Sequence, residues 1–412
     1  MVPMSVQTVG FDDAYFRDPR AAAAALAAAG PIHRFTSSSG TEGWLVTGNE
    51  LAHTVLAHPD IGKSPDAMIG GEVAANSVVG ALRRAAARGI TMHMLGADPP
   101  EHARLRGAVA EAFNPRAVTA LTPLMRERAT TLVDELDPHR PVDLIAALAF
   151  PFPMQVLFAI LGLPDRHLHR IARASRTLSD VVVARPDELR AAALDFARLI
   201  LPALALRQIR PRADLLTELT RQVRRRELGM REAVSTAGLL LVAGHETTTS
   251  LLASTLLHLM RQPGELARVR VDPTRLDAMI EETLRYDPPL PSTTLRQARR
   301  PLELGGQRIR PGEWIMVSLL AAHHDATAER DPDRFDADRK PNRHLAFGYG
   351  IHFCLGAQLA RAEARIVLRA LLARYPNPIL AVPEEDLRWR QSVIFRRLQE
   401  LPVLLEGWTF IS

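Results

Sequence analysis

The ten residues FGYGIHFCLG, Phe347 to Gly356, contain the only cysteine of a chain of 412 residues. Cys354 lies seven residues after Phe347 and two after His352, among three glycines. Glycine permits the tight turns and close approaches that a loop needs when it folds around a large flat ligand. The apolar spacing from 355 to 373 is helical, so we expect the sulfur at a helix N-terminus, where unpaired N–H groups and the helix dipole favour an anion. This setting favours a thiolate.

Four interpretations compete for Cys354. An isolated cysteine is most often a small buried apolar side chain. A nucleophile would need a base, and His352 stands two residues away in a turn, which is a poor spacing for side-chain contact. A zinc site would need several further ligands, and this chain offers no second thiolate. A haem iron needs only one thiolate.

The composition is that of an ordinary folded protein, with 47% hydrophobic and 24% charged residues. The net charge is +5, but the arginines are interleaved with acids and form no basic tail, so no nucleic acid partner is expected. The N-terminal residues resemble neither a signal peptide nor a membrane span of about 18 apolar residues. We therefore expect a cytoplasmic monomer without membrane attachment, and a single cysteine agrees with a reducing compartment.

Helical periodicity covers most of the chain. Strand-like segments are short: Ile32 to Val46, Ser292 to Val317 with turns at Gly305-Gly306 and Pro311-Gly312, and one after Asp386. Because no linker or repeat divides the chain, we expect residues 1–412 to form a single large domain, mainly α with a minor β-rich region. The expected helical stretches are 99 to 135, 143 to 161, 186 to 208, 229 to 261 and 354 to 373.

The loop FGYGIHFCLG resembles the F-G-x-G-x-H-x-C-x-G loop of the cytochrome P450 monooxygenases, with every fixed position present. The resemblance implies the P450 fold, with Cys354 as the thiolate ligand of haem b iron. It also implies that Phe347 packs near the sulfur and that His352 bonds to a haem propionate. Thiolate ligation favours cleavage of the O–O bond. The same resemblance assigns Gly348 and Gly356 to the cofactor-binding loop.

The stretch AGHETTTS, Ala243 to Ser250, lies in the longest apolar helical stretch. A zinc protease helix would need a second histidine four residues after His245, but a threonine stands there. The run of hydroxyl side chains is poor helix sequence, because β-branched χ1 is restricted and hydroxyls can bond back to carbonyls. A buried helix that merely tolerates threonines remains the alternative.

This stretch is similar to the A-G-x-[DE]-T segment of the P450 family, in which oxygen binds. The resemblance places Ala243 beside the haem and assigns Gly244 to leaving space near the iron. It assigns Glu246 and Thr247 to proton delivery, because reduction of dioxygen with insertion of one atom consumes two protons. Their presence argues against an enzyme that uses only peroxide.

The stretch EETLRYDPP places Glu282 and Arg285 three residues apart on one helix face, which by itself is a weak pattern. It resembles the E-x-x-R pair of the family, which is buried and joined by a downstream arginine; Arg334 in DPDRF matches that arginine. A departure from many bacterial members is His323-His324 where they carry Asn-Arg, and metal binding by these histidines has no support.

The stretch DPPEHARLR places His102 and Arg106 four residues apart on one helix face. A solvated face carrying two cations is the plain alternative. The family resemblance makes these two side chains partners of the haem propionates, together with Arg296.

The resemblance further implies dioxygen as co-substrate and electrons from an acidic ferredoxin, which would dock where Arg104, Arg343 and Arg361 offer positive charge. Substrate contacts are mostly small or aliphatic, so we expect hydroxylation or epoxidation of a sizeable apolar natural product. An enzyme of oxidative coupling or rearrangement and a haem-thiolate protein that binds ligand without turnover remain alternatives. The expected substrate contacts are segments 61 to 94 and Ser179 to Pro186, with Val242, Ala243, Thr247, Leu290, Thr293, Ile394 and Phe395.

Overall fold

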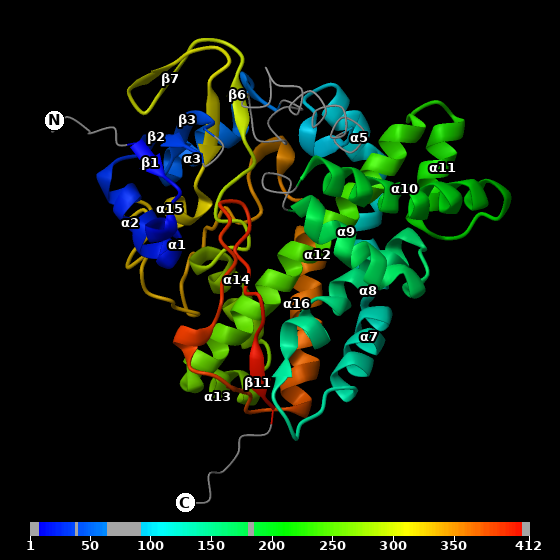
Figure 1. The fold of residues 1–412 in the computed structure, drawn as a ribbon. Coiled ribbons are helices and arrows are strands. Elements are labelled where there is room, and N and C mark those ends of the chain that lie inside the picture. Colours follow the sequence, from blue (N-terminus) through cyan, green and yellow to red (C-terminus); the bar gives the residue numbers. More distant parts are fainter. Residues whose placement is uncertain (1–7, 38–39, 64–91, 180–184, 406–412) are drawn as a thin grey trace, which may run out of the picture.

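The computed structural model describes residues 8–37, 40–63, 92–179 and 185–405. Most of these residues are helical, and most strands gather at one corner of the molecule (Figure 1). The fold class predicted from periodicity is confirmed. The helices are α1 (Asp13–Arg17), α2 (Pro19–Ala29), α3 (Asn49–Ala57), α5 (Glu101–Ala110), α6 (Pro115–Ala120), α7 (Thr122–Asp134), α8 (Pro151–Leu161), α9 (Leu168–Ser179), α10 (Pro186–Ile209), α11 (Leu215–Arg224), α12 (Met230–Arg261), α13 (Pro263–Val271), α14 (Arg275–Tyr286), α15 (Leu319–His323) and α16 (Ala357–Arg374).

The largest sheet has six strands in the order β1-β2-β3-β9-β6-β4. The antiparallel hairpin β2–β3 joins β9 in parallel, with Gly43 opposite Trp314, so segments far apart in sequence form one layer. Smaller sheets have the orders β10-β11-β5 and β7-β8. The strands are β1 (Thr8–Gly10), β2 (Ile32–Thr36), β3 (Glu42–Val46), β4 (Ile61–Gly62), β5 (Val142–Asp143), β6 (Arg296–Ala298), β7 (Leu302–Leu304), β8 (Gln307–Ile309), β9 (Trp314–Val317), β10 (Ile379–Leu380) and β11 (Pro402–Leu404).

Helix α12 runs through the middle of the helical part, beside α16 (Figure 1). It begins where the Glu232 carboxylate accepts the Gly229 N–H at 2.7 Å, and it ends just before Pro263. It packs against α8, α10, α14 and α16. Its buried leucines belong to the largest hydrophobic core, which these helices share. Neighbouring helices therefore hold α12 in place from several sides.

The structure refines the expected helix limits. The stretch 229 to 261 matches α12 within one residue. The stretch 99 to 135 is divided, because Asn114 caps a new helix that begins at Pro115. The stretch 143 to 161 begins with strand β5 and a π-helical turn, Ile145–Ala149, before α8. Most of the predicted substrate segment 61 to 94 lies outside the described residues.

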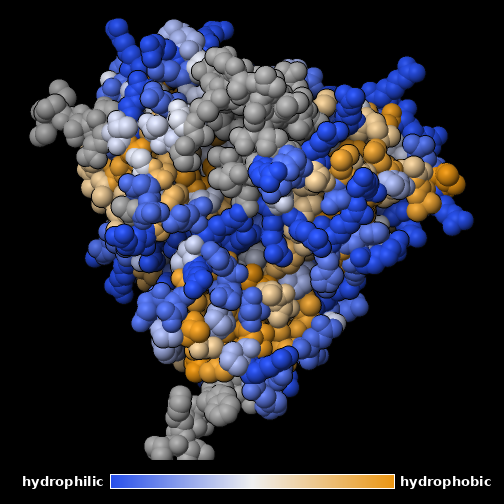
Figure 2. All heavy atoms as spheres, viewed as in Figure 1, coloured by the Kyte–Doolittle hydropathy of each residue, from blue (hydrophilic) through white to orange (hydrophobic). Residues whose placement is uncertain are grey.

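Hydrophilic side chains cover much of the face shown in Figure 2. Among the described residues, no helix is both long enough and apolar enough to span a bilayer.

Candidate active site

The loop that precedes α16 folds tightly around Cys354. Gly348 and Gly350 both have φ of 74°, a conformation that favours glycine. A Cβ on Gly350 would also lie 2.8 Å from the Leu56 carbonyl oxygen. The Cys354 N–H donates to the Phe347 carbonyl oxygen at 2.8 Å, which closes the loop on itself.

The Cys354 side chain is solvent accessible, yet protein atoms enclose it closely enough for desolvation to raise the pKa of its thiol. The Gly356 N–H and the charges of Arg106 and Arg361 act in the opposite direction and lower that pKa. A Cβ on Gly356 would meet nothing within 4 Å, so open space borders this part of the loop. The expected position of the helix N-terminus is wrong in detail, because α16 begins three residues after Cys354. The N–H group near the sulfur is that of Gly356, which precedes the helix.

One face of α12 also borders open space. Ala243 is exposed and Thr247, one turn later, is half-buried, although both stand in the middle of a packed helix. Val242 is half-buried as well. The Thr247 hydroxyl donates to the Ala243 carbonyl oxygen at 2.8 Å, and Thr248 donates to the Gly244 carbonyl oxygen at 2.9 Å. The back-bonding expected of these hydroxyls is confirmed.

Gly244 lies where α12 meets α8. A Cβ at this position would lie 2.9 Å from a methyl group of Leu157 in α8. The missing side chain therefore lets α8 pack closely against α12, and the space expected beside the iron stays a prediction.

Glu246 is buried, with 1% of its side chain exposed, and it contacts the guanidinium of Arg397. His245 Nε2 lies 3.3 Å from its other oxygen. Desolvation raises the pKa of Glu246, but the opposite effect of His245 and Arg397 is larger and lowers this pKa to about 2. No sequence pattern indicated Arg397, which lies 151 residues away from Glu246.

A cluster of basic side chains lies near the cysteine loop. The rings of His102 and His352 are 4.5 Å apart. Desolvation lowers the pKa of His352 to about 2, assisted by the charges of Lys63, Arg296, His102 and Arg106. The cluster therefore brings together the four residues predicted to bind propionates, and it adds Lys63, which sequence reasoning missed.

This cluster lacks enough acid to balance it. His102 Nε2, His352 Nε2 and Arg296 Nε are buried without a hydrogen-bond partner. Burial lowers the pKa of Arg296 to about 10, and Asp98 raises it only in part. Buried basic side chains whose nitrogens lack partners indicate a ligand that accepts hydrogen bonds, such as a carboxylate. Two carboxylates of a haem, beside an accessible thiol and an open face of α12, fit this arrangement.

Arg285 and Glu282 form a fully buried pair on α14, as predicted. All five N–H donors of Arg285 are used: two on Glu282 and three on the carbonyl oxygens of 323, 332 and 334. The prediction that the Arg334 side chain joins this pair is wrong. That side chain is exposed, and only the Arg334 carbonyl oxygen accepts a hydrogen bond from Arg285. The arginine beside Glu282 is Arg339, with Nε 3.3 Å from the carboxylate.

His323 connects this pair to the cysteine loop. Its Nδ1 donates to the Arg285 carbonyl oxygen at 2.8 Å, and its Nε2 accepts the Leu345 N–H at 2.7 Å. Burial lowers the pKa of His323 well below its usual value, which agrees with this neutral form. His324 Nδ1 pairs with the Leu320 carbonyl oxygen. Within the described ranges, no group of acidic, histidine or cysteine side chains could hold a metal ion.

The predicted substrate contacts lie on several elements. Thr293 is tied to β9, since its hydroxyl accepts the Val317 N–H at 3.2 Å. Leu290 packs against the core of the six-stranded sheet. Ile394 and Phe395 are half-buried and belong to none of the hydrophobic clusters in the described part of the chain. The contacts expected between 64 and 91 and between 180 and 184 lie outside the described residues.

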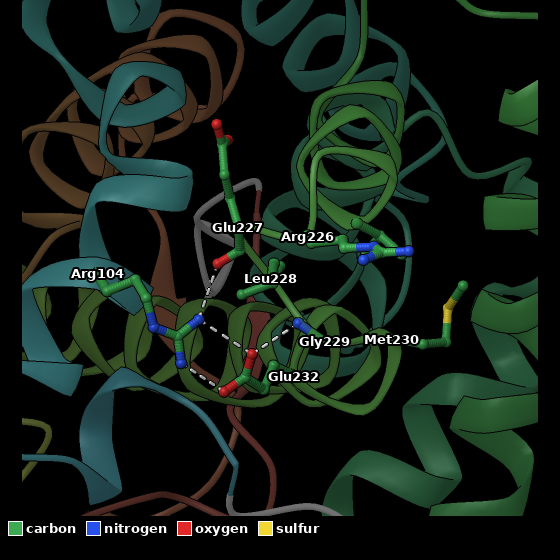
Figure 3. Close-up of a pocket in the computed structure, with 8 residues that line it drawn as sticks. Arg104, Arg226, Glu227, Leu228, Gly229, Met230 and Glu232 are labelled. Carbon is green, nitrogen blue, oxygen red and sulfur yellow. Dashed lines mark hydrogen bonds and ion pairs between the residues drawn. The ribbon is translucent and has the colours of Figure 1, made fainter.

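Two of the three arginines expected to face a ferredoxin are engaged elsewhere. Arg104 is held by Glu101 and Glu232, each at 2.6 Å, beside a surface pocket of about 450 Å³ (Figure 3). Arg361 pairs with Glu281 at 2.6 Å and stacks over the Phe347 ring, 4.4 Å from its centroid. Only the third, Arg343, is exposed without an ion pair among the described residues.

A family model described as Cytochrome P450 matches residues 142–380. The chain is 37% identical over 397 residues to Cytochrome P450 107B1 of Saccharopolyspora erythraea, covering 96% of this chain and 97% of that one. It is 35% identical over 378 residues to Mycinamicin IV hydroxylase/epoxidase of Micromonospora griseorubida, covering 91% and 92%. The P450 enzyme CxnD, solved as an enzyme for C–S bond formation in chuangxinmycin biosynthesis, superposes with a TM-score of 0.89 at 30% identity, covering 98% of both chains.

Proposed function

This chain belongs to the cytochrome P450 family, and on that premise we propose that it inserts one atom of dioxygen into a sizeable apolar small molecule of natural-product biosynthesis. It is an oxidoreductase whose cofactor is haem b. The observation that carries the monooxygenase proposal is the neighbouring pair Glu246 and Thr247. A buried ionised carboxylate stands one residue before a hydroxyl that borders open space.

The haem, when bound, supplies dioxygen activation and oxygen insertion. Cys354 is the proposed iron ligand, and the Gly356 N–H favours its thiolate form. His102, Arg106, Arg296 and His352 would hold the propionates; the unpaired donors described above support this role.

Thr247 would carry a proton toward the open face of α12. Its hydroxyl donates to the Ala243 carbonyl oxygen at rest, so its lone pairs are available to accept a proton from a neighbouring donor. A hydroxyl that accepts one proton and releases another can relay protons without changing its own charge.

The substrate class, the electron donor and the place in the cell belong to the same proposal. A hydroxylase/epoxidase among the relatives and the apolar side chains Val242, Ile394 and Phe395 support an apolar substrate. Electrons would come from a ferredoxin, and Arg343 is the exposed cation that remains from the expected docking set. We place the enzyme in the cytoplasm as a monomer of one domain.

The test is Thr247→Ala in the protein reconstituted with a ferredoxin system and with the apolar metabolite that most strongly shifts the Soret band. In a monooxygenase this variant should divert reducing equivalents from product to hydrogen peroxide. Unchanged peroxide and product yields would contradict the proposed role of Thr247. Because a structural relative forms a C–S bond, product identification decides between oxygen insertion and oxidative coupling.

A further inference from the structure

The C-terminal hairpin that carries Ile394 and Phe395 also carries the partner of Glu246. Trp389 and Leu398 form an antiparallel bridge, and the Arg390 N–H donates to the Arg397 carbonyl oxygen at 2.8 Å. Ser392 Oγ accepts the N–H groups of the two residues predicted to contact substrate, at 3.3 and 3.1 Å. Arg397 therefore lies two residues from the substrate side of a short, internally bonded hairpin.

An anchor separates the hairpin tip from Arg397. The Arg396 N–H donates to the Pro289 carbonyl oxygen at 2.9 Å, and its guanidinium contacts the buried carboxylate of Asp287. The tip and Arg397 stand on opposite sides of this fixed point. A bound molecule that displaces the tip would therefore move Arg397 by turning the hairpin about this point.

Two basic side chains face the Glu246 carboxylate: His245 from α12 itself and Arg397 from the hairpin. His245 Nδ1 is paired with the Leu241 carbonyl oxygen at 2.6 Å, so Nε2 is the ring atom turned toward the carboxylate. On its other side His245 meets the edge of Phe150, which Arg176 of α9 covers. Only Arg397 reaches outward, with 15% of its side chain exposed.

A carboxylate held ionised in this way has no proton to give. Desolvation alone would raise the pKa of Glu246, and His245 and Arg397 hold it at about 2. Before Glu246 can pass a proton to Thr247 it must first gain one, and this requires its contact with Arg397 to loosen.

We propose that Arg397 is a positioning residue that keeps Glu246 ionised while the site is empty, and that a molecule pressing on Ile394 and Phe395 moves it away. The inference rests on the proposed function, because it assigns Glu246 a place in proton supply. It makes proton delivery depend on an occupied substrate site.

The experiment measures the carboxyl C=O infrared band of protonated Glu246 in the ferric holoprotein, assigned by its loss when Glu246→Gln is added to Arg397→Gln. Wild type should show no protonated band over the pH range in which the protein stays folded. In Arg397→Gln the proton affinity of Glu246 should rise about 10- to 1,000-fold, and the band should appear within that range. Arg397→Lys should restore the wild-type behaviour. Arg396→Gln, which breaks the other arginine–carboxylate contact of the hairpin, should destabilise the protein and leave the band absent.

A second arm uses 4-phenylimidazole as an apolar probe of the haem site. Its binding to wild type should make the protonated Glu246 band appear, and it should cause no further change in Arg397→Gln, where the band is already present. The inference is overturned if Arg397→Gln titrates like wild type or if the probe produces no protonated Glu246 band in wild type. Should Arg397→Gln fail to fold, the probe experiment on wild type and Arg397→Lys decides alone. Failure of the proposed function would appear separately, as a ferrous carbon monoxide adduct without the red-shifted Soret band of thiolate ligation.

Discussion

Replacing Glu282 with Gln tests the buried network behind the cysteine loop. One carboxylate oxygen accepts Arg285 Nη2, Asp336 N–H and Arg339 Nε at 2.8 to 3.3 Å. The other accepts Arg285 Nε at 2.9 Å and Asn342 Nδ2 at 3.0 Å. An amide must place its NH₂ group on one side, where it would face two or three donors and lose those hydrogen bonds.

The expected cost is large because the remaining charges stay buried. Arg285 has no exposed side-chain surface, and Arg339 has 8% exposed. Removing one partner of a buried ion pair costs about 3–5 kcal/mol, which is a large part of the roughly 5–15 kcal/mol that holds a typical protein folded. Glu282→Gln should therefore lower the free energy of unfolding by that amount and accelerate haem loss.

Urea unfolding of the ferric holoprotein, followed by tryptophan fluorescence and the Soret band, measures this change. Asp338→Asn is the matched control: it is also an acid-to-amide change beside two arginines, but 55% of the Asp338 side chain is exposed. Exposed pairs contribute little, so the control should cost a small fraction of the Glu282→Gln effect. Equal effects of the two variants would refute the view that this network fixes the segment before the cysteine loop.

Two further predictions concern charge. Lys63→Met should accelerate haem transfer to apomyoglobin, because it removes one of the buried cations that face His352. Desolvation raises the pKa of Glu281, but Arg361 and His344 hold it at about 2, below the unfolded value of about 4.3. Its stabilising effect is therefore present above pH 4.3 or so and lost as the pH falls toward 2; thermal unfolding between pH 7 and pH 3 should show a weaker acid dependence in Glu281→Gln.

The parts of the site that lie close together in sequence could be predicted from it. Spacing of three or four residues fixes which side chains share a helix face, so the pairs Glu282–Arg285 and His102–Arg106 were readable from sequence alone. The glycine pattern predicted a tight loop, and the positive φ values of Gly348 and Gly350 confirm it. Local geometry was sufficient for these predictions.

Partners supplied by distant loops could not be predicted. Arg334 and Arg339 stand in the same stretch, DPDRFDADRK, and only the path of the chain decides which of them reaches Glu282. Lys63 reaches the Thr294 carbonyl oxygen because β4 pairs with β6, and two-residue strands leave almost no periodic signal. Gly244 shows a related limit: its close contact with α8 depends on helix packing, which the sequence motif does not indicate.

Side chains from distant segments also determine the protonation state of the buried carboxyl groups around α12. Glu246 and Glu363 are equally hidden, each with 1% of the residue exposed. Burial raises the pKa of Glu363 well above its usual value, and the hydrogen bond with Thr248 offsets this only in part; among the described residues, no ion pair reaches it. Glu246 meets the same desolvation and yet stays ionised, because Arg397 and His245 reach it. The protonation state of each acid thus depends on which loop arrives beside it, so a hairpin that moves can change that state without any change in α12 itself.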